Sequence, residues 1–515
     1  MAVNIIKKGI EVERLVGRET VQLQVRAEAL VPGAGRESVQ VLMADGFASV
    51  SESEAQMGRA VVSGGVFCQA AYRLGQEGGA RSLTAQAPFE QIVEIEGITP
   101  KMSVQTLCTA DHVEAEYESG HMVFYVTVTI RVRVCSLDTV EAVSDVEGVD
   151  GVQKKMQEIC SAKLNAETSQ IISLEDEIRL PAALHARVTL MQWASPVVEK
   201  TERDLGGVRV SGEVKAEALI ASGVANRPVA LVRYALPFDQ LISLPDWIAG
   251  EPEATAEIAR LRIDVDEAEE GEDSELDIHC DVNVTVRMNG QDCVEVMSDV
   301  YAVGDSELTG ETERLVLCGG VKRCEGQENF RSTLLLPEGA PGVGTVLAVR
   351  VHPQISGWKE ENGQAAAEGV LEATVLYMQA GEEVLSSAQA ELPFQVKLGC
   401  LPGAQAWGTV SAADAEATAI MSDRLELRCV LRAETEERVA EEATVLTGIS
   451  EAQAAPQPGG VGIFYPEKGE TFWTIGRRYR IEEEALRSAN GGIAEAEPGK
   501  PLLIVRGGSA YRGRD

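Results

Sequence analysis

A glycine followed by a Pro-Phe pair recurs three times along the chain, and this pattern restricts the fold more than any other feature. Gly64, Gly212 and Gly369 each stand third in a similar apolar segment. A Pro-Phe pair follows each glycine, with glycine-to-proline separations of 24, 25 and 24 residues. Agreement to one residue across three segments indicates one structural unit that is repeated in tandem.

Each repeat ends in a long run of alternating apolar and polar residues, at 121–135, 275–288 and 423–434. In the second run one phase is apolar: Leu276, Ile278, Cys280, Val282, Val284, Val286 and Met288. Successive side chains of a strand point to opposite faces, so this alternation predicts half-buried antiparallel strands. We therefore expect a mainly β protein with three antiparallel β-sandwich or barrel-like modules in tandem.

The recurring residues have physical reasons to recur. Phe89, Phe238 and Phe394 are expected to fill the cores of modules that contain few aromatic residues. Proline has no N–H and suits an edge or first position of a strand. A glycine inside an alternating strand indicates a bulge or a close backbone approach.

These patterns divide the chain into seven segments. The connector is expected to be partly helical because residues 151–166 have helical composition, and the linker is rich in Ala, Pro, Gly and Gln. The expected segments are module 1 (1–145), the connector (146–170), module 2 (171–303), module 3 (304–450), a linker (451–462), a small C-terminal domain (463–506) and a tail (507–515).

The C-terminal segment has a different pattern that predicts a small βααβ domain. A strand at 463–465 leads to a turn and to Thr471, a typical N-cap residue. A helix over 471–480, a second over 481–490 and a returning strand after 498 complete the unit. The apolar positions expected to face inward are Phe472, Ile475, Tyr479, Ile481, Ala485 and Leu486.

This βααβ unit resembles a LysM domain. The turn Gly469-Glu470-Thr471, then Ile475, Tyr479, Leu486 and Asn490, and the run 498–502 fall in the order typical of that family, which usually has Asp-Thr-Leu where this chain has Glu470-Thr471-Phe472. LysM domains bind N-acetylglucosamine polymers in a groove between two loops. The resemblance implies glycan- or partner-binding contacts at Gly469, Glu470, Thr471, Phe472, Asn490, Gly491 and Ile493.

The repeated module resembles the domain of the SipL family of spore-coat morphogenetic proteins. The resemblance rests on the strand that carries the glycine, on the elements 87–97 and 236–246, and on the long alternating strand. It implies a non-enzymatic adaptor in endospore coat assembly, in the mother-cell cytoplasm at the forespore surface. The implied partner is a stage IV sporulation protein A-like ATPase. The alternative is a cell-wall anchor that binds peptidoglycan through its LysM-like domain.

Composition excludes several other classes of protein. The formal net charge of −35 argues against nucleic acid and anionic membrane surfaces. The N-terminal residues lack an apolar run typical of a signal peptide, and no stretch approaches the roughly 18 apolar residues of a membrane span. Tail residues Arg506, Arg512 and Arg514 make a basic end. The acidic run 264–277 is expected to be a solvated tip between two strands.

No catalytic or metal-binding motif is apparent, so we expect no enzyme activity, no cofactor and no metal site. The chain contains no P-loop, GxSxG or HExxH motif, and its five histidines are scattered. Its ten cysteines include no CxxC pair, and they are expected to be free thiols in a reducing compartment. A glycan hydrolase with a LysM targeting module is the enzyme alternative, and it would require paired carboxylates in a cleft.

Overall fold

The computed structural model describes residues 3–34, 38–75, 79–224, 227–266, 273–303, 306–337, 339–361, 364–382, 384–400, 407–455 and 459–506. The acidic run 264–277 and the linker are therefore described only in part, and the tail after Arg506 lies outside the described residues. Among the described residues, no helix is long and apolar enough to cross a membrane.

The chain is mainly β, as predicted, and each module contains six strands. Module 1 contains β1 (Asn4–Leu30), β2 (Val39–Gln56), β3 (Arg59–Leu74), β4 (Ala80–Glu94), β5 (Ser103–Glu118) and β6 (His121–Glu147). Module 2 contains β7 (Val152–Leu180), a 3-10 turn (Ala182–Leu184), β8 (Ala186–Asp204), β9 (Gly207–Val224), β10 (Arg227–Ser243), β11 (Glu251–Asp266) and β12 (Ser274–Ala302). Module 3 contains β13 (Ser306–Leu335), β14 (Val343–Glu361), β15 (Gln364–Gln379), β16 (Leu385–Lys397), β17 (Trp407–Met421) and β18 (Arg424–Gln453).

The strands of each module form two three-stranded antiparallel sheets that enclose one core. In module 1 the sheet orders are β2-β3-β4 and β1-β6-β5, and the other modules repeat this order. Phe89, Phe238 and Phe394 are buried in the three cores, as predicted. All seven apolar positions of the alternating run in β12 are also buried, because that face of the strand lines the module core.

The recurring glycine lies directly opposite the recurring phenylalanine and beside a bulge. Gly64 pairs with Phe89 across β3 and β4, and the β2 strand on its other side shifts register between Val50 and Glu52. A Cβ atom on Gly64 would lie 2.2 Å from the Ser49 carbonyl oxygen and 2.5 Å from the Phe89 ring. Both sequence interpretations of this glycine, a bulge and a close approach, are therefore confirmed.

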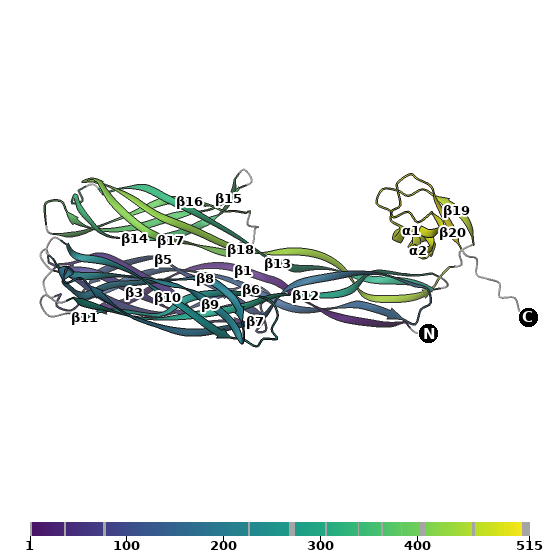
Figure 1. Ribbon diagram of the computed structural model, residues 1–515, viewed down its shortest axis with the longest axis horizontal. Helices are drawn as coiled ribbons and strands as arrows, with labels where there is room; N and C mark the ends of the chain where they lie inside the picture. Colours follow the sequence, from purple (N-terminus) through teal and green to yellow (C-terminus); the bar gives the residue numbers. More distant parts are fainter. Residues whose placement is uncertain are drawn as a thin grey trace, which may run out of the picture.

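The longest strands of each module continue past the cores as three two-stranded ribbons, which pack side by side to form a stalk (Figure 1). Each ribbon places apolar side chains in a shared core, in which the three modules contribute at corresponding positions. These residues are Ile10, Val12, Ala142, Val143, Val146, Ile159, Val296, Met297, Val300, Ala302, Leu308, Leu315, Leu317, Val445, Leu446 and Ile449.

The predicted helix over 151–166 is wrong, because these residues form the stalk half of β7. Residues 152–166 pair antiparallel with residues 288–302 of β12, and Ile159 enters the same stalk core as Val296. Helical composition is a weak preference, and burial between two other ribbons overrides it.

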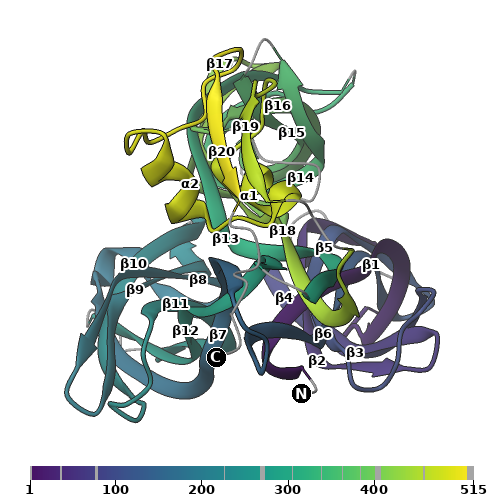
Figure 2. The same cartoon turned by 90° about the vertical axis from the view of Figure 1, so that its right-hand side faces the viewer.

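Viewed along the stalk, the three modules surround a common axis (Figure 2). Residues at corresponding positions of the modules meet there in one apolar cluster. The cluster consists of Leu42, Met43, Ala71, Leu190, Met191, Leu219, Val229, Ala348, Leu376, Met378 and Leu385. The chain is therefore a pseudo-threefold assembly of its own repeats.

A βααβ domain follows the stalk, as predicted. It contains β19 (Gly460–Phe464), α1 (Phe472–Tyr479), α2 (Glu483–Ala489) and β20 (Leu502–Arg506). Thr471 caps α1 by accepting a hydrogen bond from the Thr474 N–H. One expected core residue is wrong: Ala485 is exposed, since the short helix α2 turns Leu486 inward instead.

Candidate functional site

Of the four predicted contact residues in the first loop of the βααβ domain, two are exposed and two are engaged in contacts within the domain. Gly469 and Thr471 are exposed, although the Thr471 hydroxyl is used in capping α1. The Glu470 carboxylate accepts a hydrogen bond from the Glu467 N–H at 2.8 Å and pairs with Arg478 at 2.7 Å. Phe472 is buried in the core of the domain. The loop thus presents backbone and hydroxyl groups rather than a free carboxylate.

The second predicted loop follows α2. Asn490 acts as a clamp: its amide nitrogen donates to the Leu486 and Leu503 carbonyl oxygens at 2.8 and 2.9 Å, and its amide oxygen accepts from the Leu503 N–H at 2.6 Å. Gly491 is exposed with φ of 76°, and Ile493 is 41% exposed. Gly491 and Ile493 are therefore accessible to a ligand, whereas Asn490 holds the loop in place.

The two loops are joined by a backbone contact. The Gly499 N–H, in the segment between α2 and β20, donates to the Pro466 carbonyl oxygen at 2.9 Å. Beside them, the outward face of the small sheet is apolar and exposed: Val461 pairs with Val505, and Ile463 pairs with Leu503. This end of the molecule therefore combines glycine-rich backbone with aliphatic side chains.

The opposite side of the domain is attached to the tip of the stalk, a contact that sequence reasoning missed. Trp473 Nε1 donates to Asp299 Oδ2 at 2.8 Å, and Arg477 Nη1 lies 2.9 and 3.0 Å from the two Asp299 oxygens. The Tyr301 hydroxyl donates to the Ile481 carbonyl oxygen at 2.9 Å, and its ring packs edge-on against Trp473. Burial raises the pKa of Tyr301 to about 12, which keeps this donor protonated.

Among the described residues, the aspartate and tyrosine of this attachment occur in the ribbon of module 2, and module 3 adds an ion pair between Glu307 and Arg480 at 3.4 Å. A hydroxyl residue bulges from the long strand of every ribbon, and its side chain donates to the neighbouring strand: Ser144 to Ile6 O, Ser298 to Lys155 O and Thr447 to Glu311 O. The residue that follows the bulged one is Asp145 in module 1, Asp299 in module 2 and Gly448 in module 3. The residue two places further on is Glu147, Tyr301 and Ser450, respectively. The combination of an aspartate and a tyrosine at these two positions therefore occurs in the ribbon of module 2 and not in the other two.

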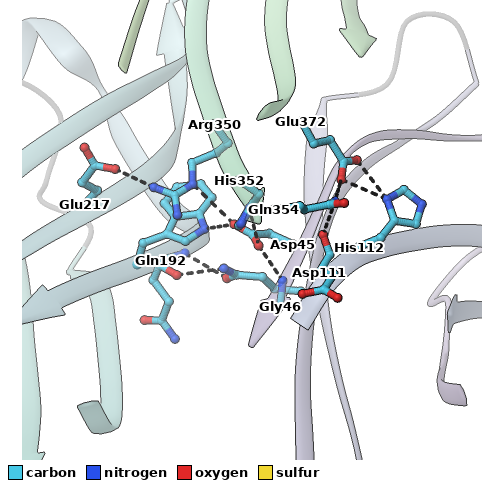
Figure 3. A network of polar contacts seen from close by, with 12 residues as sticks. Asp45, Gly46, Asp111, His112, Gln192, Glu217, Arg350, His352, Gln354 and Glu372 are labelled. Carbon is cyan, nitrogen blue, oxygen red and sulfur yellow. Dashed lines mark hydrogen bonds and ion pairs between the residues drawn. The ribbon is translucent and has the colours of Figure 1, made fainter. Parts of the chain in front are cut away.

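A second polar site lies on the pseudo-threefold axis, between the modules (Figure 3). Asp45, Trp193 and Arg350 occupy the same position in the three modules, six residues before the unpaired bulge residues Ser51, Glu199 and Ser356. Asp45 accepts from the indole N–H of Trp193, its Oδ2 lies 3.4 Å from Arg350 Nε, and its Oδ1 lies 3.0 Å from His352 Nε2. The Arg350 guanidinium also lies over the Trp193 ring and pairs with Glu217 at 3.0 Å.

The environment of Asp45 favours its charged form. Burial alone would raise the pKa of its carboxyl, but the charges of His352 and Arg350, with the Trp193 hydrogen bond, outweigh burial and hold the pKa well below its usual range. Asp45 therefore joins the three modules as a charged group.

A second set of contacts joins modules 1 and 3. Gln354 Nε2 donates to the Asp111 carbonyl oxygen at 2.5 Å, and His112 Nδ1 lies 3.0 Å from both oxygens of Glu372. A cavity of about 1220 Å³ extends along the same axis and is lined by all three modules. In its described lining, Asp45 pairs with Arg350 and His352 across the modules, and Arg131 donates to the Gly408 carbonyl oxygen of module 3. These contacts indicate an interface between the modules.

The expectation that the cysteines are free thiols is wrong for four of them. Cys160 and Cys293 are cross-strand partners in the stalk and form a disulfide, and Cys324 and Cys400 form another. These pairs are 133 and 76 residues apart in sequence. Strand register aligns Cys160 with Cys293, whereas Cys400 follows the end of β16 and reaches Cys324 on β13. Among the described residues the one cluster of potential metal ligands is Glu158 with Cys160 and Cys293, whose sulfurs are bonded to each other.

Comparison with known proteins identifies one part of module 1. Residues 39–118 match the family described as "SipL, SPOCS domain". The match begins at the first residue of β2 and ends at the last residue of β5. No curated protein and no solved structure matches the chain significantly. The matched domain is not an enzyme domain, and it indicates a role associated with the spore coat.

Proposed function

We propose that this protein is a non-enzymatic adaptor in endospore coat assembly. In this proposal the three modules and the stalk form a rigid scaffold in the mother cell. The scaffold presents the βααβ domain to a partner at the forespore surface. The matched SPOCS segment supports the setting, and the shared stalk core supports the rigidity.

One observation carries the proposal: the βααβ domain is held by one side and exposed on the other. Trp473 and Arg477 on α1 are engaged with Asp299 of the stalk. Gly469, Gly491 and Ile493 remain exposed in the full chain. A domain fixed in this way can bind a partner without losing the rotational freedom of a flexibly tethered domain.

The partner we propose is a stage IV sporulation protein A-like ATPase, as the resemblance to the SipL family implies. The exposed surface has a protein-binding composition, since aliphatic side chains of β19 and β20 lie beside the two loops. The alternative is peptidoglycan or another N-acetylglucosamine polymer. Gly469 and Gly491 support this alternative, because nothing lies within 4 Å of their Cβ positions and backbone there can approach a sugar closely.

The test compares the full chain with a variant of the exposed loop. Ile493→Asp places a charge on that loop, and Ile420→Asp, at a 53% exposed position of β17, is the matched control. The immobilised proteins are offered the purified ATPase and purified peptidoglycan in separate assays. We expect Ile493→Asp to lose about tenfold or more of its affinity for the ATPase, as a charge introduced into an apolar contact does.

The outcomes separate the two candidates. Capture of the ATPase by the control but not by Ile493→Asp supports the adaptor. Capture of peptidoglycan alone, with the same dependence on Ile493, supports the wall anchor instead. If neither ligand is retained by the unaltered chain, both assignments of the loops are wrong.

A further inference from the structure

Module 2 has an open seam between two of its edge strands. β7 is bonded to β12 and β10 to β9, and no backbone hydrogen bond joins β7 to β10 among the described residues. A cleft of about 360 Å³ lies between the two strands, lined by residues 170–174 and 237–240. Both strands therefore face this cleft with one side of their backbone unpaired.

The corresponding seam of module 3 is closed. Gln170 of module 2 and Gly326 of module 3 occupy the same position. Gln170 pairs with the residue four places after Cys280 on β12, and Gly326 pairs with the residue four places after Cys429 on β18. Both cysteines face the module core. At Gly326 the backbone of β13 approaches Lys397 so closely that a Cβ atom would lie 2.0 Å from the Lys397 oxygen. The Gly399 N–H donates to the Glu325 oxygen at 2.8 Å, and the Cys324–Cys400 disulfide lies beside it.

Module 1 also differs from module 2 at this position. Val21 stands where module 2 has Gln170, and it is partly buried against the module core, whereas Gln170 is exposed. At this position module 2 thus has an exposed polar residue, whereas module 1 has a partly buried valine and module 3 has a glycine against which the neighbouring strand packs.

The two edges of the cleft are not equivalent. β10 contains Pro237, which has no N–H and therefore cannot donate a hydrogen bond to an added strand at that edge. β7 has no proline from Val152 to Leu180, so every one of its residues keeps an N–H group. An exposed strand edge with intact donors is a template for another strand. The cleft also offers apolar side chains, with Ile172 and Phe238 buried and Ile171 61% exposed.

Carboxylates surround this edge. Glu167 and Glu175 flank residues 170–174 on β7, and Asp239 lies across the cleft on β10. All three are exposed, and each contacts a side chain of its own sheet: Glu167 pairs with Arg287, Glu175 lies 3.3 Å from the His279 ring, and Asp239 pairs with Arg209. A second copy of this chain, with a net charge of −35, would be repelled. A segment with basic ends would be attracted.

We propose that the β7 edge of module 2 binds an extended segment of another protein, apolar at its centre and basic at its ends, by strand addition. The segment adds to β7 outside β12, places alternate apolar side chains over Ile172 and Phe238, and directs its basic ends to Glu167 and Glu175. This site is independent of the βααβ domain and of the partner proposed for it.

The test uses the full chain and a labelled probe peptide, Lys-Lys-Val-Thr-Val-Lys-Lys. Two further peptides serve as controls: one is N-methylated at alternate residues and cannot pair as a strand, and the other has glutamate in place of lysine. Fluorescence anisotropy measures affinity, and hydrogen exchange locates the bound peptide. We expect binding of the first peptide, at least about tenfold weaker binding of both controls, and slower exchange in residues 170–174.

A matched pair of variants completes the test. Ile171→Lys places a like charge beside the peptide on an exposed position of β7, and Ile420→Lys does the same on β17 of module 3. We expect Ile171→Lys to weaken binding about tenfold while Ile420→Lys leaves it unchanged. Equal binding of the N-methylated peptide, equal binding by Ile171→Lys, or protection confined to other strands or to residues 460–506 would each overturn the proposal.

Discussion

Gly64 lies directly across from Phe89 on the neighbouring strand, and the same relationship joins Gly212 to Phe238 and Gly369 to Phe394. The phenylalanine ring covers the glycine, while the preceding strand bulges on the other side. The near-constant spacing in the sequence is therefore the length of one hairpin, measured from the covered glycine to the ring that covers it.

Replacing Gly369 with alanine should destabilise module 3. The added Cβ atom would lie 1.9 Å from the Gln354 carbonyl oxygen and 2.8 Å from the Phe394 ring, so the backbone or the ring must move. We expect a loss of about 1–3 kcal/mol of unfolding free energy, measured by urea denaturation. Gly357→Ala is the control, since nothing lies within 4 Å of its Cβ position. Equal losses for the two variants would show that the close approach does not matter.

Acid should weaken the contacts of Asp45 at the axis on which the three modules meet. Because the pKa of Asp45 is lowered in the folded protein, its contribution to stability is present above the pKa of an unfolded aspartate, about 3.9, and is lost as the pH falls below it. Asp45→Asn should therefore destabilise the protein by roughly 3 kcal/mol at neutral pH and flatten the fall in stability between about pH 5 and 2. Thermal unfolding across this pH range measures both effects.

Asp204→Asn is the matched control for Asp45→Asn. The pKa of Asp204 is also lowered, by its hydrogen bonds with Arg209 and the Leu205 N–H, but this carboxylate is exposed. We expect little change in stability or in its pH dependence, because an exposed pair is screened by solvent. An Asp45→Asn profile that parallels that of the unaltered protein would contradict the role assigned to the axis.

Asp299→Ala should detach the βααβ domain from the stalk. The variant removes the acceptor of both Trp473 and Arg477, and a hydrogen bond to a charged group contributes about 1.5–3 kcal/mol. We expect limited proteolysis between β18 and β19 to accelerate about tenfold, and the radius of gyration to increase in small-angle scattering. Asp145→Ala removes the equivalent residue of module 1, with its bond to the Val146 N–H and its ion pair with Lys154, but no contact with the βααβ domain, so it should leave both measurements unchanged.

Reduction should weaken the stalk. The disulfide of Cys160 and Cys293 joins residues 133 positions apart, and such a crosslink typically contributes about 2–4 kcal/mol. The double variant Cys160→Ser with Cys293→Ser should unfold at lower urea than the unaltered protein when both are oxidised, and at the same urea when both are reduced, because reduction also opens the Cys324–Cys400 disulfide in each. A difference between the two reduced proteins would show that the serines act in some other way.

The sequence predicts best those features that depend on one module alone. The apolar phase of β12 emerges from simple alternation, and the roles of Gly64 and Phe89 from their spacing. Thr471 was identifiable as an N-cap because capping is a local interaction. These features need no information on how distant segments meet.

Features that arise between modules could not be predicted in this way. Residues 152–166 are strand because two other ribbons pack on them, and the Cys160–Cys293 disulfide depends on strand register. One signal was present: once the repeats are aligned, Asp145, Asp299 and Gly448 fall at one position, and only module 2 adds a tyrosine two residues later. A chemical difference at one position of otherwise similar repeats marks an asymmetric contact.

The three side chains at the axis, Asp45, Trp193 and Arg350, set a condition on how such an assembly can be built. A homotrimer of separate chains would have to place three identical residues there: three carboxylates that repel, three guanidinium groups that repel, or three indoles that crowd. Covalent linkage in one polypeptide removes that restriction, so an acid, a base and an aromatic ring can share a single centre. The composition of this centre is consequently fixed, since exchanging any one repeat for a second copy of another would duplicate one of the three groups and remove another.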